Sequence, residues 1–185
     1  EEIRQPHVSP DGRNVAFVMN TSNSRNQVLS VFVVPAEGGG VRNVADHISV
    51  DYTWSGDGRS LAYIGCTASK GDDQGTIQLG SLTTITVADS SGTLLKEWSE
   101  RKDRVGLLFN GALSVKWLRD GRLLFSSVEV TLPATPRDMP QQWSLFVLDP
   151  RMPASVSRVL GRDLPQPRDL SLPLFEVSPD ESKVL

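Results

Sequence analysis

Two adjacent aspartates form the most suggestive pair of oxygen ligands in this sequence. Asp72 and Asp73 lie in the segment 69–75, which is rich in small and polar residues. Clustered carboxylate oxygens are the ligands that hard cations prefer. The segment lacks an Asp-x-Asp ladder and a distal glutamate that would bind a cation through both oxygens. We therefore favour a solvated loop, with a cation site as the alternative, and predict no metal and no cofactor.

The residue patterns of nucleophilic catalysts are missing. The sequence contains no Gly-x-Ser-x-Gly segment, which would form the sharp turn that exposes an activated serine. It contains two histidines, His7 and His47, and each stands just before a predicted strand. A structural role is the simpler interpretation for both, rather than that of a catalytic base. We predict that this chain is not an enzyme and has no catalytic residues, and we leave the activity of a longer protein open.

Composition excludes several kinds of partner. The 19 basic residues are scattered along the chain and are balanced by 22 acidic ones, for a formal net charge of -3. No basic field is therefore present to hold nucleic acid. Apolar runs such as Val31 to Val34 have the length of a strand, whereas a membrane helix needs about 20 residues. We predict no nucleic-acid binding and no membrane insertion of this segment.

Four similar segments recur and are centred on Asp11, Asp57, Asp120 and Asp180. In the first segment Pro10 fixes φ near the value that a turn requires, Asp11 can accept bonds from neighbouring amides, and Gly12 tolerates a positive φ. A large apolar residue precedes each aspartate by three positions: Val8, Trp54, Trp117 and Val177. Each segment therefore predicts two strands joined by a tight turn.

A third and a fourth strand follow each of the first three hairpins. These strands are expected at 29–34 and 41–45, at 82–88 and 94–98, and at 143–148 and 156–160. Four-stranded units at such a period predict an all-β protein of the β-propeller type, with a β-sandwich as the alternative. Trp54 and Trp117 occupy equivalent positions and are expected to pack between neighbouring sheets.

The repeat predicts a β-propeller fragment of about three and a half four-stranded blades. It forms a single partial domain, 1–185, with blades at approximately 5–46, 51–98 and 113–160 and the opening hairpin of a fourth at 173–185. Because a closed ring needs at least four blades, we expect further blades or domains of the same chain. Glu181 stands where the repeat has glycine, so the fourth turn is expected to differ in type or to carry strain.

The segments Ser9-Pro10-Asp11-Gly12 and Ser178-Pro179-Asp180 resemble the Pro-Asp-Gly repeats of TolB-like propellers, which are similar to WD repeats. Similar repeats form the propeller that covers the active site in relatives of prolyl oligopeptidase. The resemblance implies fold more than function. It also implies a propeller that acts through protein contacts, in the periplasm or outside the cell, with a cytoplasmic location as the alternative.

Loop lengths suggest where a partner would bind. In an up-and-down blade the short turns share one face, and the longer connections, which here are 19–27, 65–81, 99–112, 127–142 and 161–173, share the other. Long loops on a rigid scaffold are common recognition sites. The proline-rich segment 131–140 is a candidate contact loop, with Arg137 and Met139 as adaptable groups, although it could also be a spacer. Asp72 and Asp73 lie in a second candidate loop.

Three functions remain open at this stage. The first is a non-catalytic scaffold that binds a protein or peptide through the long-loop face. The second is the gating propeller of a larger serine peptidase of the prolyl oligopeptidase type. A docking propeller attached to a cytoplasmic signalling protein is the third.

Overall fold

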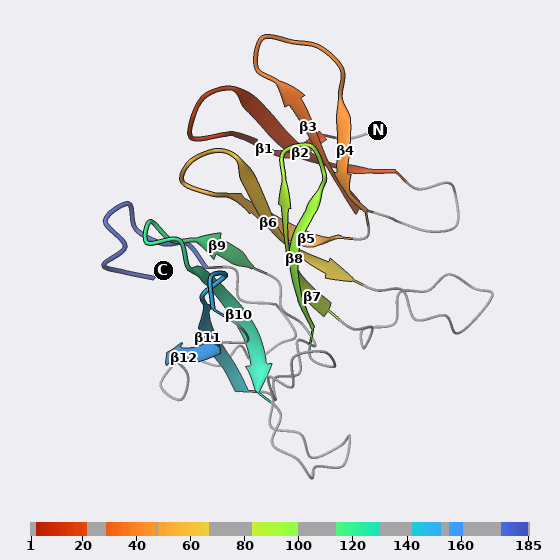
Figure 1. The fold of residues 1–185 in the computed structure, drawn as a ribbon. Helices are drawn as coiled ribbons and strands as arrows, with labels where there is room; N and C mark the ends of the chain where they lie inside the picture. Colours follow the sequence, from red (N-terminus) through yellow and green to blue (C-terminus); the bar gives the residue numbers. More distant parts are fainter. Residues whose placement is uncertain are drawn as a thin grey trace, which may run out of the picture.

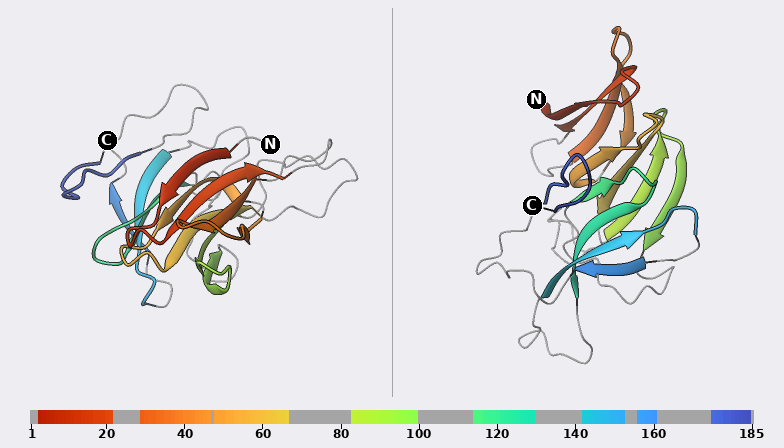
Figure 2. Two further views of the ribbon diagram at one scale, coloured as in Figure 1. Left: turned by 90° about the horizontal axis from the view of Figure 1, so that it is seen from above. Right: turned by 90° about the vertical axis from the view of Figure 1, so that its left-hand side faces the viewer.

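The all-β prediction is confirmed by the computed structural model, in which three antiparallel sheets follow one another in space in the order of the chain (Figure 1 and Figure 2). The structure describes residues 3–21, 29–46, 48–66, 83–99, 114–129, 142–152, 156–160 and 175–184. Among these residues no helix is long and apolar enough to cross a membrane.

Each sheet is one four-stranded blade in which every strand pairs with the next along the chain. Blade 1 contains β1 (Ile3–Val8), β2 (Asn14–Asn20), β3 (Leu29–Pro35) and β4 (Arg42–Ala45). Blade 2 contains β5 (Ile48–Trp54), β6 (Ser60–Cys66), β7 (Thr83–Asp89) and β8 (Leu94–Ser99). Blade 3 contains β9 (Val115–Trp117), β10 (Leu123–Glu129), β11 (Gln142–Leu148) and β12 (Val156–Leu160). A start of blade 4 is formed by residues 175–184, with a single bridge between Val177 and Val184.

The apolar core lies between the blades. Blades 1 and 2 bury one cluster of side chains between them, blades 2 and 3 a second, and blade 3 and the start of blade 4 a third. Blade 2 is therefore apolar on both faces: Leu61 and Tyr63 face blade 1, whereas Ala62 and Ile64 face blade 3. This explains why β6 is a continuous apolar run instead of an alternating one.

Hydrogen bonds join the first strand of blade 2 to the first two strands of blade 1. The Tyr52 hydroxyl of β5 lies within hydrogen-bond distance of the backbone carbonyls of Gln5 and Ala16 and shares its one proton between them, and the Trp54 indole nitrogen donates to the carbonyl of His7 at 3.2 Å. Gln5 has a φ of 49° and lies where the register of β1 shifts, so this irregularity turns a carbonyl toward blade 2. Burial raises the pKa of the Tyr52 phenol, which keeps it a donor.

The two tryptophans of the repeat pack between blades as expected. Trp54 is buried in the cluster between blades 1 and 2, and Trp117 packs, partly buried, against the cluster between blades 2 and 3. The expected place of His7 was wrong, because it lies within β1 and not before a strand. Its ring lies 5.3 Å from that of Tyr52, while His47 is outside the described residues.

Two equivalent glycines test how closely the blades approach. Gly58 has a φ of +71°, and a Cβ there would lie 2.7 Å from the Asp11 carboxylate of blade 1, whereas Gly12 has a φ of +73° and open space around it. We expect Gly12→Ala to cost about 1 to 2 kcal/mol in backbone strain. Gly58→Ala should cost a further 1 to 3 kcal/mol, roughly, because Asp11 must move. Urea unfolding measures both, and equal losses would contradict the close approach.

Candidate interaction surface at the turns

The Asp-centred turns repeat one hydrogen-bond network. In blade 1 the Ser9 hydroxyl donates to Asp11 Oδ1 at 2.6 Å, and the same oxygen accepts the backbone N–H of Arg13 at 3.1 Å. The Ser9 hydroxyl also accepts the N–H of Asn14 at 2.9 Å, and Ser9 and Asn14 pair through their backbones. Blade 2 has the same bonds around Asp57, and blade 4 around Asp180. Serine and aspartate thus fix the turn from within the repeat.

The fourth turn keeps its type and carries the expected strain. The backbone N–H of Glu181 donates to the carbonyl of Ser178 at 2.8 Å, as that of Gly12 does to Ser9 in blade 1. Glu181 has a φ of 56°, in the left-handed region that favours glycine. Its Oε1 accepts the backbone N–H of Arg119 in blade 3 at 2.6 Å. The glutamate therefore gains a bond between blades where glycine would avoid strain.

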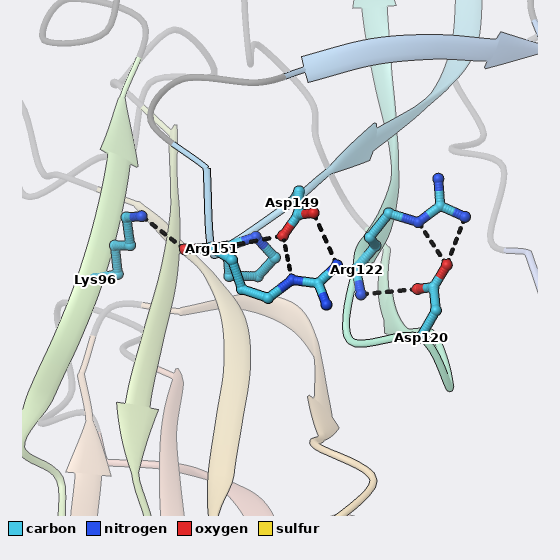
Figure 3. Close-up of polar contacts among 6 residues, drawn as sticks. Lys96, Asp120, Arg122, Asp149 and Arg151 are labelled. Carbon is cyan, nitrogen blue, oxygen red and sulfur yellow. Dashed lines mark hydrogen bonds and ion pairs between the residues drawn. The ribbon is translucent and has the colours of Figure 1, made fainter.

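The third turn replaces serine with an arginine contact. Leu118 stands at the serine position, and Asp120 Oδ2 binds the side chain of Arg122 through Nε at 2.6 Å and Nη2 at 2.6 Å (Figure 3). Asp120 Oδ1 still accepts the backbone N–H of Arg122 at 3.0 Å. Leu118 packs against the apolar cluster between blade 3 and the start of blade 4. The turn therefore survives the loss of its serine.

In the turn between the third and fourth strands an aspartate again accepts hydrogen bonds from the residues that follow it. In blade 2 Asp89 Oδ1 accepts the N–H groups of Ser91 and Thr93 at 2.8 and 2.9 Å. In blade 3 Asp149 holds the guanidinium of Arg151 through Nε and Nη2, each at 2.8 Å (Figure 3). Lys96 of β8 donates to the carbonyl of Pro150 at 2.6 Å, which ties this turn to blade 2.

The turn aspartates are held in their charged form. Hydrogen bonds from the Arg151 side chain lower the pKa of Asp149 to about 2, and those from the Ser178 and Ser182 hydroxyls lower the pKa of Asp180 to about 2. Hydrogen bonds from Ser9 and Ser55 lower the pKa of Asp11 and Asp57 in the same direction. Donors directed at a carboxylate favour its ionised state.

A second polar group joins the first strands of blades 2, 3 and 4. Asp51 is buried, and its Oδ2 accepts the Ser114 hydroxyl at 2.7 Å and the backbone N–H of Val115 at 3.2 Å. Lys116 Nζ lies 3.6 Å from that oxygen and 3.4 Å from Oε1 of Glu176. Ser114 is 1% exposed and donates its proton to Asp51, so it cannot reach a substrate as a nucleophile. The group ties blades together.

The residues singled out from the sequence lie elsewhere. Asp72, Asp73, Arg137 and Met139 all fall outside the described residues, as do most of the long connections. Within the described ranges, no three His, Cys, Asp or Glu side chains come together to hold a metal ion.

Sequence reasoning missed the alignment of the arginines. The basic residues are scattered along the sequence, yet Arg13, Arg59 and Arg122 occupy the same turn position in successive blades, and all three are exposed. The signal was present in the repeat itself, because an arginine follows Asp-Gly in each of the first three copies. Among the described turns at this end of the blades, those of blade 3 form the candidate binding surface, because Arg122 and Arg151 are each held there by an aspartate through two nitrogens.

These features define an all-β chain with the β-propeller fold. No family model matches the chain, and no curated protein matches it. Solved structures with the same fold include the β-propeller domain of the Trilobed protease from Pyrococcus furiosus, with a TM-score of 0.58 and 17% identity over 85% of this chain and 43% of that one.

Two further structures belong to the two groups that the repeats resemble. Acylaminoacyl peptidase from Pyrococcus horikoshii has a TM-score of 0.57 at 16% identity, over 86% of this chain and 25% of that one. TolB from Acinetobacter baumannii has a TM-score of 0.53 at 15% identity, over 85% of this chain and 32% of that one. The chain thus resembles TolB and peptidase propellers and spans between 25% and 43% of the length of these structures.

Acid should weaken the fold through the turn aspartates. Because the folded-state pKa of Asp149 and of Asp180 is about 2, their contribution is complete above the ordinary value near 3.8 and is lost as the pH falls toward 2. We expect the double variant Asp149→Asn/Asp180→Asn to lose less of its urea midpoint between pH 6 and pH 3 than the parent protein loses. Glu37→Gln, at an exposed turn of blade 1, is the control and should keep the parent's dependence.

Replacement of Glu181 separates its strain from its hydrogen bond. We expect Glu181→Ala to speed amide hydrogen exchange at Arg119 about threefold to tenfold, because a net bond is worth about 0.5 to 1.5 kcal/mol. Glu181→Gln keeps an acceptor and should keep most of the protection. If the Arg119 amide remained as protected in Glu181→Ala as in the parent protein, the hydrogen bond between Glu181 and Arg119 would not stabilise the contact between blades 3 and 4.

Proposed function

We propose that this chain is a non-catalytic β-propeller scaffold that binds a protein or peptide through its long-loop face, and that residues 1–185 act as one partial propeller domain. One observation carries the proposal. The short Asp-centred turns lie at one end of each blade, so the connections 22–28, 67–82 and 130–141, which join second to third strands, leave from the other end. The ends of the strands that these connections join therefore lie together at one end of three packed sheets, and long loops on a rigid scaffold are common recognition sites.

The binding loops in this proposal are those with the most suggestive side chains. Arg137 and Met139 belong to the 130–141 connection, and Asp72 and Asp73 to the 67–82 connection. Methionine and arginine suit protein interfaces because both adapt to varied partners. A periplasmic or extracellular location fits the likeness to TolB, and further blades or domains of the same chain would cover the outer face of blade 1.

Replacement of the blade 3 loop tests the scaffold function. The full chain would first be cross-linked in cells, and the partner identified by mass spectrometry would be purified. We expect replacement of residues 131–140 by a Gly-Ser linker to weaken its affinity at least tenfold, roughly 1.4 kcal/mol. Replacement of residues 35–40, a turn at the opposite end of blade 1, should leave affinity within about twofold. Unchanged affinity after the 131–140 replacement would exclude that loop as the contact.

A second function is favoured by the likeness to peptidase propellers. The Trilobed protease domain and acylaminoacyl peptidase have the TM-scores of 0.58 and 0.57 given above, against 0.53 for TolB. In this alternative the chain is the gating propeller of a larger serine peptidase, and the nucleophile lies outside these 185 residues. A fluorophosphonate probe applied to the full-length protein decides between them: covalent labelling of a serine supports the peptidase, and absence of labelling supports the scaffold.

A further inference from the structure

The turns of blade 3 carry more positive charge than those of the other described blades. Arg119, Arg122 and Arg151 stand against Asp120 and Asp149, and Lys96 of β8 adds a cation beside them. Acidic groups are in excess in the described turns of blade 2, which carry Asp57, Arg59 and Asp89, and of blade 4, which carry Asp180, Glu181 and Lys183. This local excess is set in a chain whose formal net charge is -3.

The two central guanidinium groups are held in fixed orientations. Arg151 binds Asp149 through two nitrogens, and Arg122 binds Asp120 through two nitrogens (Figure 3). A guanidinium has five N–H donors, so each arginine keeps donors for another acceptor. Their side chains are 65% and 45% exposed. Groups that are already oriented lose little side-chain entropy when a ligand binds.

An exposed apolar side chain lies beside these arginines. Met152 follows Arg151 in the same turn and is 53% exposed. Lys96 reaches the turn of Met152 through the carbonyl of Pro150 and also lies 5.2 Å from the centre of the Trp98 ring. The hydrogen bond from Lys96 to Pro150 therefore brings a charged group next to the exposed Met152.

We propose that this surface, the blade 3 turn patch of Arg122, Arg151 and Met152, binds an acidic extended segment of a partner protein. Carboxylates of the segment pair with the outward N–H groups of the two arginines, and an apolar side chain between them covers Met152. The acidic turns of blades 2 and 4 repel the same segment and so restrict it to blade 3. The patch lies at the end opposite the long loops and adds a second contact to the proposed scaffold function.

Binding of a defined peptide tests the patch. The probe is a fluorescein-labelled dodecapeptide of alternating Glu and Leu, measured by fluorescence anisotropy with the full chain, beside a peptide with Gln in place of every Glu. We expect the Glu peptide to bind and the Gln peptide to bind at least tenfold more weakly. Arg122→Gln/Arg151→Gln should weaken the Glu peptide at least tenfold. Arg13→Gln/Arg59→Gln, which removes the same charge from blades 1 and 2, should change it by less than twofold.

A second variant keeps the test decisive if the arginine pair proves necessary for folding. Met152→Asp adds a carboxylate at an exposed position, so the fold should persist while the Glu peptide binds at least threefold more weakly. The proposal is overturned if the Glu peptide fails to bind, if both arginine pairs matter equally, or if a thymidine oligonucleotide binds as tightly through the same residues. Loss of partner binding after replacement of residues 131–140 with the patch intact bears on the scaffold function alone.

Discussion

Burial of both faces of a sheet is the constraint on which the rest of the structure depends. Blade 2 presents Leu61 and Tyr63 to one neighbour and Ala62 and Ile64 to the other. Exposure of either face to water would therefore lose the free energy that burial of its apolar side chains contributes to folding. Blade 2 therefore needs a blade on either side. A single four-stranded sheet of this sequence has no core of its own, which is the physical reason for stacked repeats.

Polar contacts fix the relative position of neighbouring blades, which apolar packing alone does not determine. Apolar packing is not directional, but the bonds from Tyr52 to Gln5 and Ala16 fix β5 against blade 1, and Asp51 fixes β9 against blade 2 through Ser114 and Val115. A buried carboxylate is tolerated there because three donors surround it. The blades are thus held at a defined position, which gives the turns at their ends fixed relative places.

Local chemistry explains which features the sequence could predict. The hairpins at Asp11, Asp57 and Asp120 follow from turn residues and flanking apolar runs, and the third and fourth strands of blade 3 begin and end within a residue of their predicted bounds. The contact of Asp51 with Ser114, and that of Glu181 with Arg119, could not be predicted, because they depend on how separate sheets pack. The loop residues Asp72 and Arg137 stay predictions, since the described residues do not include them.

The third repeat shows how one turn can acquire a different surface without disturbing the stack. Its leucine at position 118 extends the core toward blade 4, and Arg122 binds Oδ2 of Asp120, an oxygen that the serine of the other repeats does not use. The backbone bond from Gly121 to Leu118 is the same as in the other repeats, so the turn itself is unchanged. Leu118 therefore serves packing against the start of blade 4, whereas the exposed side chains of Arg122 and Arg151 lie at the end of the sheet, where they alter charge without altering packing. The needs of folding explain the leucine, and the proposed contact outside the chain would explain the two arginines.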